Sequence, residues 1–108
     1  MFIYNLVVAM VLHFLADFVA QNDWMAINKS QSFKALGLHS LVYSFCFLGF
    51  GLGFMLWMLL THLIIDGITS RVTSYYWKQE KRHEFFVVIG FDQLLHNLVL
   101  ILGVLKCL

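Results

Sequence analysis

The hydrophobic residues of the chain fall into four long segments, which three polar or glycine-containing breaks separate. The segments are Phe2–Gln21, Ala35–Phe50, Phe54–Ser70 and Phe85–Leu105. A helix that crosses a membrane needs about 17–25 residues, and the first and last segments have this length. The stretch Ala35–Ser70 covers 36 residues, which is too long for one such helix and sufficient for two short ones. Three glycines in its middle, Gly49, Gly51 and Gly53, are the natural hairpin.

This pattern predicts an all-α integral membrane protein. We expect a compact bundle of about four transmembrane helices, forming a single domain over residues 1–108. A β-sheet is disfavoured because its unpaired edges cannot face lipid. The breaks on either side of the middle stretch, Asn22–Lys34 and Arg71–Glu84, are expected to be loops.

Composition supports a membrane location. Hydrophobic residues make up 61% of the 108 residues and charged residues only 12%, whereas a soluble domain carries about 25% charged residues. A chain this small could not bury so many apolar side chains in water, because surface area outruns volume in small proteins. The formal net charge of +1 excludes a nucleic-acid partner, since such proteins need a basic surface that neutralises phosphates.

The basic residues predict an orientation. Six of the seven Lys and Arg residues lie in the first and third breaks, and only Lys106 lies elsewhere. In a four-helix chain these two breaks are on the same side of the membrane, and loops rich in Lys and Arg face the cytoplasm. We therefore expect a multi-pass protein with both termini outside and the two basic loops in the cytoplasm.

Ionisable residues inside the apolar segments follow a regular spacing. The first segment carries His13 and Asp17, the third carries His62 and Asp66, and the fourth carries Asp92 and His96 in reverse order. Residues four apart share one helix face. Because the fourth helix runs the opposite way, all three aspartates are expected on the cytoplasmic side of their histidines. With His39 of the second segment, these residues predict a cluster of four histidines and three aspartates in the cytoplasmic half of the bundle.

Histidine nitrogens and carboxylate oxygens are ligands of divalent metals. Three buried carboxylates would repel one another, and a cation would remove that repulsion. We therefore predict a divalent metal ion, zinc or manganese, with seven candidate ligands: His13, Asp17, His39, His62, Asp66, Asp92 and His96. The set suits two ions, or one ion with a residue left as general base, and the candidate catalytic residues are His39, Asp66 and Asp92. The alternative is that His–Asp hydrogen bonds only hold the helices together.

Several short motifs resemble a known family. They are His13–Asp17–Phe18 with Gln21, Asn28–Lys29, Leu38–His39 with Tyr43, His62-x-x-x-Asp66 and Asp92–Gln93-x-x-His96. In this order they resemble domain of unknown function family 3307, small integral-membrane proteins of bacteria and their phages, over nearly the whole chain. The resemblance implies a compact multi-helix protein of the bacterial inner membrane with a polar site made by the motif residues. A looser similarity is to metal-dependent inner-membrane hydrolases.

Three functions are compatible with these features. The first is an intramembrane metal-dependent hydrolase that acts on a phosphate ester or a lipid-linked substrate, with Gln21 and Gln93 orienting water or ligands. The second is a small transporter or ion-conducting homo-oligomer that uses the same His and Asp residues. The third is a structural or regulatory membrane protein. Membrane lipids are the expected partners. Lys29 is either an ordinary basic residue of a cytoplasmic loop or a binder of anionic lipid headgroups.

Overall fold

The computed structural model describes residues 1–107, and these are helical throughout apart from short connections. The helices are α1 (Phe2–Phe14), the π-helical segment η1 (Leu15–Val19), α2 (Asp23–Asn28), α3 (Phe33–Phe45), the 3₁₀ turn η2 (Leu48–Phe50), α4 (Leu52–Lys78) and α5 (Arg82–Cys107). No strand occurs within residues 1–107. The prediction of an all-α chain is therefore confirmed.

Local side-chain chemistry explains where the short helices begin. The Asn22 side chain accepts a hydrogen bond from the backbone N–H of Met25 at 2.8 Å, and it caps α2. The Ser32 hydroxyl accepts one from the N–H of Ala35 at 3.3 Å and caps α3. Such caps satisfy N–H groups that have no partner within the helix. Gly51 has a φ of 106°, which glycine adopts without steric cost, and it turns the chain into α4.

The expectation of about four membrane-spanning helices stays a prediction. Three helical runs in residues 1–107 are long and apolar enough to cross a membrane: Phe2–Val19, α4 and α5, with 18, 27 and 26 residues. Helix α3 has only 13 residues and extends about 20 Å, short of a hydrocarbon core of about 30 Å. The chain turns at Gly51, near the middle of the apolar stretch Ala35–Ser70, where the glycines predict a hairpin. The two helices differ in length because α3 ends at Phe45 whereas α4 continues beyond Ser70 to Lys78.

The prediction of a loop over Arg71–Glu84 is wrong for most of these residues. Helix α4 continues to Lys78 and α5 begins at Arg82, which leaves a three-residue turn. Glu80 in this turn has a φ of 58°, and the Trp77 and Phe85 rings pack across it with their centroids 4.9 Å apart. Polar residues show where a helix can leave an apolar environment, but they do not end its backbone hydrogen bonding.

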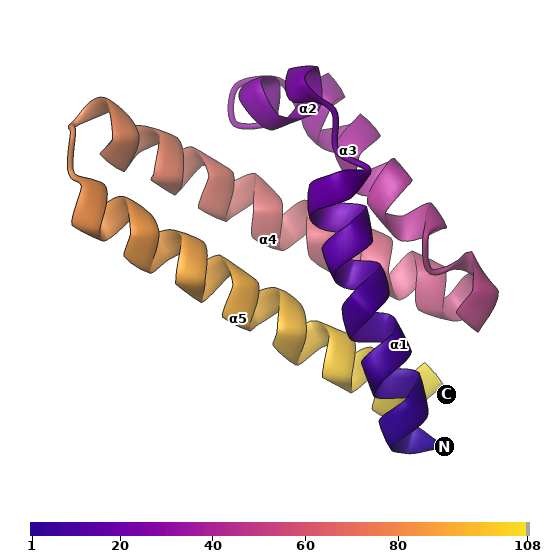
Figure 1. Ribbon diagram of the computed structural model, residues 1–108. Coiled ribbons are helices and arrows are strands. Elements are labelled where there is room, and N and C mark those ends of the chain that lie inside the picture. The colour runs from indigo at the N-terminus through magenta and orange to yellow at the C-terminus, as the bar shows by residue number, and fades with distance from the viewer. Residues whose placement is uncertain (108) are drawn as a thin grey trace.

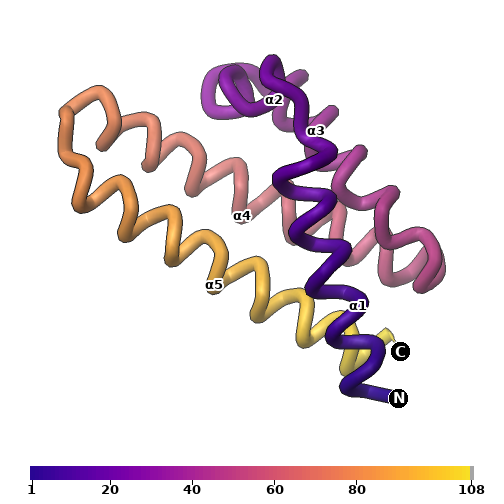
Figure 2. The backbone as a smooth tube through the Cα atoms, viewed as in Figure 1, coloured from indigo at the N-terminus to yellow at the C-terminus, as the bar shows by residue number. Residues whose placement is uncertain are grey.

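Helices α4 and α5 form a long antiparallel hairpin (Figure 1). Helix α1 crosses this hairpin, and α3 runs beside the first part of α4. The short helix α2 lies at the end of α1, next to α3, and the N-terminus lies near the end of α5 (Figure 2). The turn of the hairpin extends away from α1 and α3.

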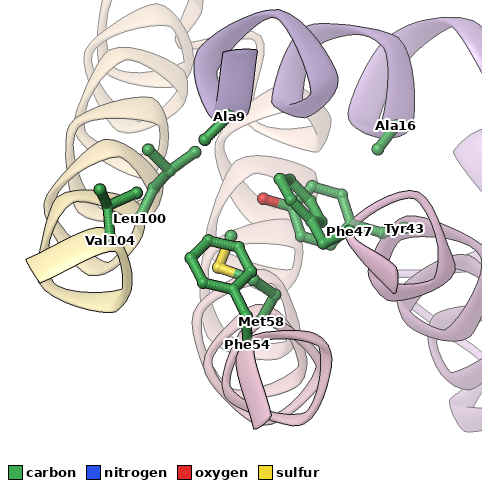
Figure 3. Close-up of a cluster of buried hydrophobic side chains, with 8 residues drawn as sticks. All are labelled: Ala9, Ala16, Tyr43, Phe47, Phe54, Met58, Leu100 and Val104. Carbon is green, nitrogen blue, oxygen red and sulfur yellow. The ribbon is translucent and has the colours of Figure 1, made fainter. Parts of the chain in front are cut away.

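Eight of the eleven buried apolar residues of the described chain form one cluster, drawn in Figure 3. Ala9 comes from α1, Tyr43 from α3, Phe54 and Met58 from α4, and Leu100 from α5. On both α4 and α5, these residues are farther from the hairpin turn than the His and Asp residues are. The apolar cluster therefore closes one end of the interior.

The interior is unusually polar and the exterior unusually apolar. Polar and apolar residues contribute equally to the interior, because eleven polar or charged residues and eleven apolar residues of the described chain are buried. Large apolar side chains face outward instead; Ile64, Ile68 and Phe86 are each 63% exposed. Since apolar surface is costly in water and harmless in lipid, this distribution is consistent with a membrane protein.

Candidate metal centre

Seven residues from five helical elements meet inside the fold. His13 comes from α1, Asp17 from η1, His39 from α3, and the pairs His62/Asp66 and Asp92/His96 from α4 and α5. All seven are buried, with at most 9% of any of them exposed. The sequence-predicted cluster is thus present as a geometric feature.

Asp17 lies in the π-helical segment η1. The wider turn of this segment is closed by the bond from Ala20 N–H to the Leu15 carbonyl at 2.8 Å. Single π-helical turns inside α-helices occur frequently at functional sites. Here the segment ends α1 with Ala16 and Asp17 directed inward.

Three potential ligand atoms, from Asp17, His39 and His62, converge in a first group, and Asp66 lies beside the two histidines. The Asp17 Oδ1 atom is 3.1 Å from His39 Nε2 and 3.9 Å from His62 Nε2. The Asp66 Oδ2 atom is 3.6 Å and 3.7 Å from the same two nitrogens. A tetrahedral ion with ligands at about 2.1 Å would separate its ligand atoms by about 3.4 Å. The four His–Asp distances, 3.1–3.9 Å, are close to this value.

A second group shares Asp17 with the first. Potential ligand atoms of Asp17, Asp92 and His96 lie within 4.8 Å of one another. His96 Nε2 is 3.3 Å from Asp92 Oδ1, and the Thr69 hydroxyl donates a hydrogen bond to that same oxygen. Thr69 was not among the sequence-predicted site residues, although its position seven residues after His62 and three after Asp66 places it on the same face of α4.

Several buried nitrogens in this cluster have no hydrogen-bond partner within residues 1–107. Both ring nitrogens of His62 and of His96, and Nδ1 of His39, are in this state. An unsatisfied buried polar group costs about 1–3 kcal/mol, and native proteins rarely leave one. A cation beside Asp17 would use the lone pair of His62 Nε2, and this nitrogen is the strongest sign that the cluster holds a ligand rather than only joining helices.

His13 differs from the other histidines. Its Nε2 is 2.9 Å from the Gln93 Oε1, and its Nδ1 is 2.8 Å from the Tyr43 hydroxyl. The amide oxygen can only accept, so Nε2 donates, and in the neutral ring Nδ1 accepts from Tyr43. His13 thus lies outside both convergent groups, with both nitrogens hydrogen-bonded.

Gln93 links His13 to the carboxylates. Its Nε2 donates to Asp17 Oδ2 at 3.3 Å and to Asp92 Oδ2 at 3.1 Å. The sequence interpretation of Gln93 as an orienting residue agrees with these contacts. Gln21, its proposed counterpart, lies beyond the end of η1 and lines a cavity next to Asp17.

That cavity has a volume of about 170 Å³ and is lined by all three aspartates. Lys29 also lines it, with Nζ 3.2 Å from Asp66 Oδ2. The sequence predicted Lys29 only as a basic loop residue or a headgroup binder, and its contact with Asp66 was missed. The only sequence signal for this contact was the presence of Asn28–Lys29 among the family motifs. The position of a residue outside the long helices cannot be inferred from helical spacing.

The comparisons with known proteins identify a family. A family model described as "Protein of unknown function (DUF3307)" matches residues 5–107. The chain belongs to this family. The matched span contains every residue of the two convergent groups. No curated protein and no solved structure matches the chain. The looser similarity to metal-dependent hydrolases stays a prediction.

The role of Gln93 can be tested by Gln93→Leu. This change leaves Asp17 Oδ2, Asp92 Oδ2 and His13 Nε2 without their partner, so we expect the free energy of unfolding to fall by about 1–3 kcal/mol. The measurement is unfolding in detergent with a chelator present, so that metal binding does not contribute. Gln79→Leu, in the exposed turn between α4 and α5, is the matched control. Equal stability of the two variants would contradict the network.

Proposed function

We propose that this protein is an intramembrane metalloprotein of the bacterial inner membrane that hydrolyses a phosphate ester. The ion, zinc or manganese, is bound by Asp17, His39, His62 and Asp66. The unpartnered nitrogens of the buried histidines in the described chain carry this proposal. A set of two imidazoles and two carboxylates suits these metals, and it suits softer ions less well because it contains no sulfur ligand.

One bound ion leaves Asp92 free to act as general base. Thr69 and Gln93 donate hydrogen bonds to its two oxygens, which fixes the carboxylate at the edge of the 170 Å³ cavity. A divalent ion next to the cavity supplies Lewis-acid polarisation of a phosphoryl oxygen. Asp92 then takes a proton from water as the water oxygen bonds to phosphorus. The bond from phosphorus to the ester oxygen breaks, and that oxygen leaves as an alcohol after receiving the proton.

The apolar cluster favours hydrolysis over transport through one chain. Met58 and Phe54 lie one and two turns before His62, and Leu100 and Val104 follow His96. These side chains are buried on the side of the histidines away from the aspartate-lined cavity. A site open on one side suits a reaction with a bound substrate, whereas an ion path would need a polar continuation on the other side.

The basic residues support an orientation with the aspartate-lined cavity toward the cytoplasm. Lys29 lines that cavity, and Lys78 and Arg82 flank the turn of the α4–α5 hairpin. For this orientation, α3 and η2 must return the chain across the membrane although α3 is short. The proximity of the N-terminus to the end of α5 supports such a return (Figure 1).

Metal content tests the binding site directly. Purified wild-type protein is expected to contain about one zinc or manganese ion per chain, and its melting temperature is expected to fall when a chelator is added. Asp66→Asn and His62→Gln are expected to lose the ion and to melt at a temperature that the chelator does not change. His83→Gln, at an exposed position in the first turn of α5, should behave as wild type. Chelator-independent melting of the wild type would leave only a structural role for the cluster.

Turnover tests the reaction. With 4-nitrophenyl phosphate as a soluble phosphate ester, Asp92→Asn is expected to lower kcat by about 100-fold or more while the ion stays bound. Glu84→Gln, on the exposed first turn of α5, serves as the control. Metal-loaded wild type without turnover, combined with ion flux in liposomes, would favour the transport function instead.

Cysteine labelling tests the orientation. In a background with Cys46 and Cys107 replaced by alanine, Gln31→Cys and Lys81→Cys are expected to react with an impermeant maleimide only after cells are opened. Lys106→Cys should react in intact cells. If α3 did not return the chain across the membrane, Gln31→Cys and Lys81→Cys would be labelled from opposite sides.

A further inference from the structure

A second and larger cavity lies beside the candidate metal centre. Its volume is about 440 Å³, within the range of about 300–1,000 Å³ that is usual for ligand sites. It lies between α2 with its following loop and the hairpin formed by α4 and α5. Its polar lining consists of the ammonium group of Lys29 and the hydroxyls of Ser30, Ser70, Thr73 and Ser74.

The two cavities adjoin each other. Lys29, Ser70 and Thr73 line both of them. Ser70 is only 6% exposed, and its hydroxyl has no hydrogen-bond partner among the described residues. A buried hydroxyl at the junction is therefore available to a bound molecule, next to the ammonium group of Lys29.

These groups suit an anionic oxygen ligand. Lysine supplies three N–H donors and a serine hydroxyl supplies one, as a phosphate group requires. Without a bound ion, the Lys29 charge is paired with Asp66 at 3.2 Å. If Asp66 binds a metal ion, as the proposed function requires, the negative charge of Asp66 is compensated and Lys29 can pair with a phosphate.

The rest of the cavity lining is apolar and reaches the surface. Ile27 and Trp77 line it, and they are 70% and 50% exposed. The Arg82 guanidinium lies 3.7 Å from the centre of the Trp77 ring. An aromatic surface with a cation beside it is typical of the membrane interface, where an apolar chain and a charged headgroup meet.

We propose that this cavity binds the phosphate headgroup of a membrane amphiphile and presents it to the aspartate-lined cavity. Lys29 and Ser70 contact the phosphate, and the apolar chain leaves past Ile27 and Trp77. The inference rests on the proposed function and narrows its substrate class to lipids with a terminal phosphate monoester. A free phosphate ion has the same headgroup chemistry but no apolar chain.

The test uses quenching of Trp77 fluorescence by lipids that carry bromine on their acyl chains. Full-length, metal-loaded protein is titrated in detergent with brominated phosphatidic acid or brominated phosphatidylcholine, and Trp77→Phe isolates the signal of this residue. Wild type is expected to prefer phosphatidic acid. Lys29→Met and Ser70→Ala are each expected to weaken that preference by about tenfold. Lys34→Met, on the exposed first turn of α3, should leave it unchanged.

Each outcome separates the possibilities. Equal quenching by the two lipids, or a preference that survives both Lys29→Met and Ser70→Ala, would overturn the inference. Displacement of phosphatidic acid by an equal concentration of inorganic phosphate would overturn the amphiphile as the ligand. The metal content of the same samples tests the proposed function separately. Bound metal without a lipid preference overturns only this inference, and a lipid preference without metal overturns only the metal centre.

Discussion

The buried carboxylate of Asp17 is the constraint on which the interior depends. One of its oxygens faces His39 and His62, and the other accepts a hydrogen bond from Gln93. An isolated charge in an apolar interior is costly unless it is paired. Helices α1, α3, α4 and α5 must therefore bring their polar faces to one point. The π-helical turn that holds Asp17 is the local distortion that accompanies this arrangement.

The same order of residue types repeats along the helices that meet at Asp17. On α4, Met58 precedes His62, which precedes Asp66 and then Ser70. On α5 the order is reversed, from Leu100 through His96 to Asp92. Because α4 and α5 are antiparallel, the apolar residues of one helix lie beside those of the other, and the same holds for the histidines and for the aspartates. An apolar layer closes one end of the interior, the histidines lie next to it, and the aspartates line a cavity at the other end.

Charge balance separates a ligand site from a purely structural network. Asp17, Asp66 and Asp92 lie close together, and Lys29 is the lysine that reaches them. A network that served only to join helices would satisfy its donors and acceptors internally. This one satisfies His13, through Tyr43 and Gln93, but leaves both nitrogens of His62 and His96 without partners in the described chain. A cation would compensate the excess negative charge and would bind the unpartnered Nε2 of His62, which is why a metal is the proposed ligand.

The amino-acid sequence determines the features that depend on neighbours along the chain. Composition indicates helices with apolar exteriors, and a spacing of four residues is sufficient to place His62 with Asp66, and Asp92 with His96, on common helix faces. The tertiary structure alone decides the rest. The length of α4 was missed because the charged and hydroxyl residues between Arg71 and Lys78 indicated a loop, whereas the segment remains helical and its Trp77 ring packs on Phe85 across the turn. Three features join segments that are distant in sequence. They are the hydrogen bonds of His13, the contact between Lys29 and Asp66, and the cavity beside Ser70. Such contacts depend on how helices cross, and periodicity within one helix carries no information about that.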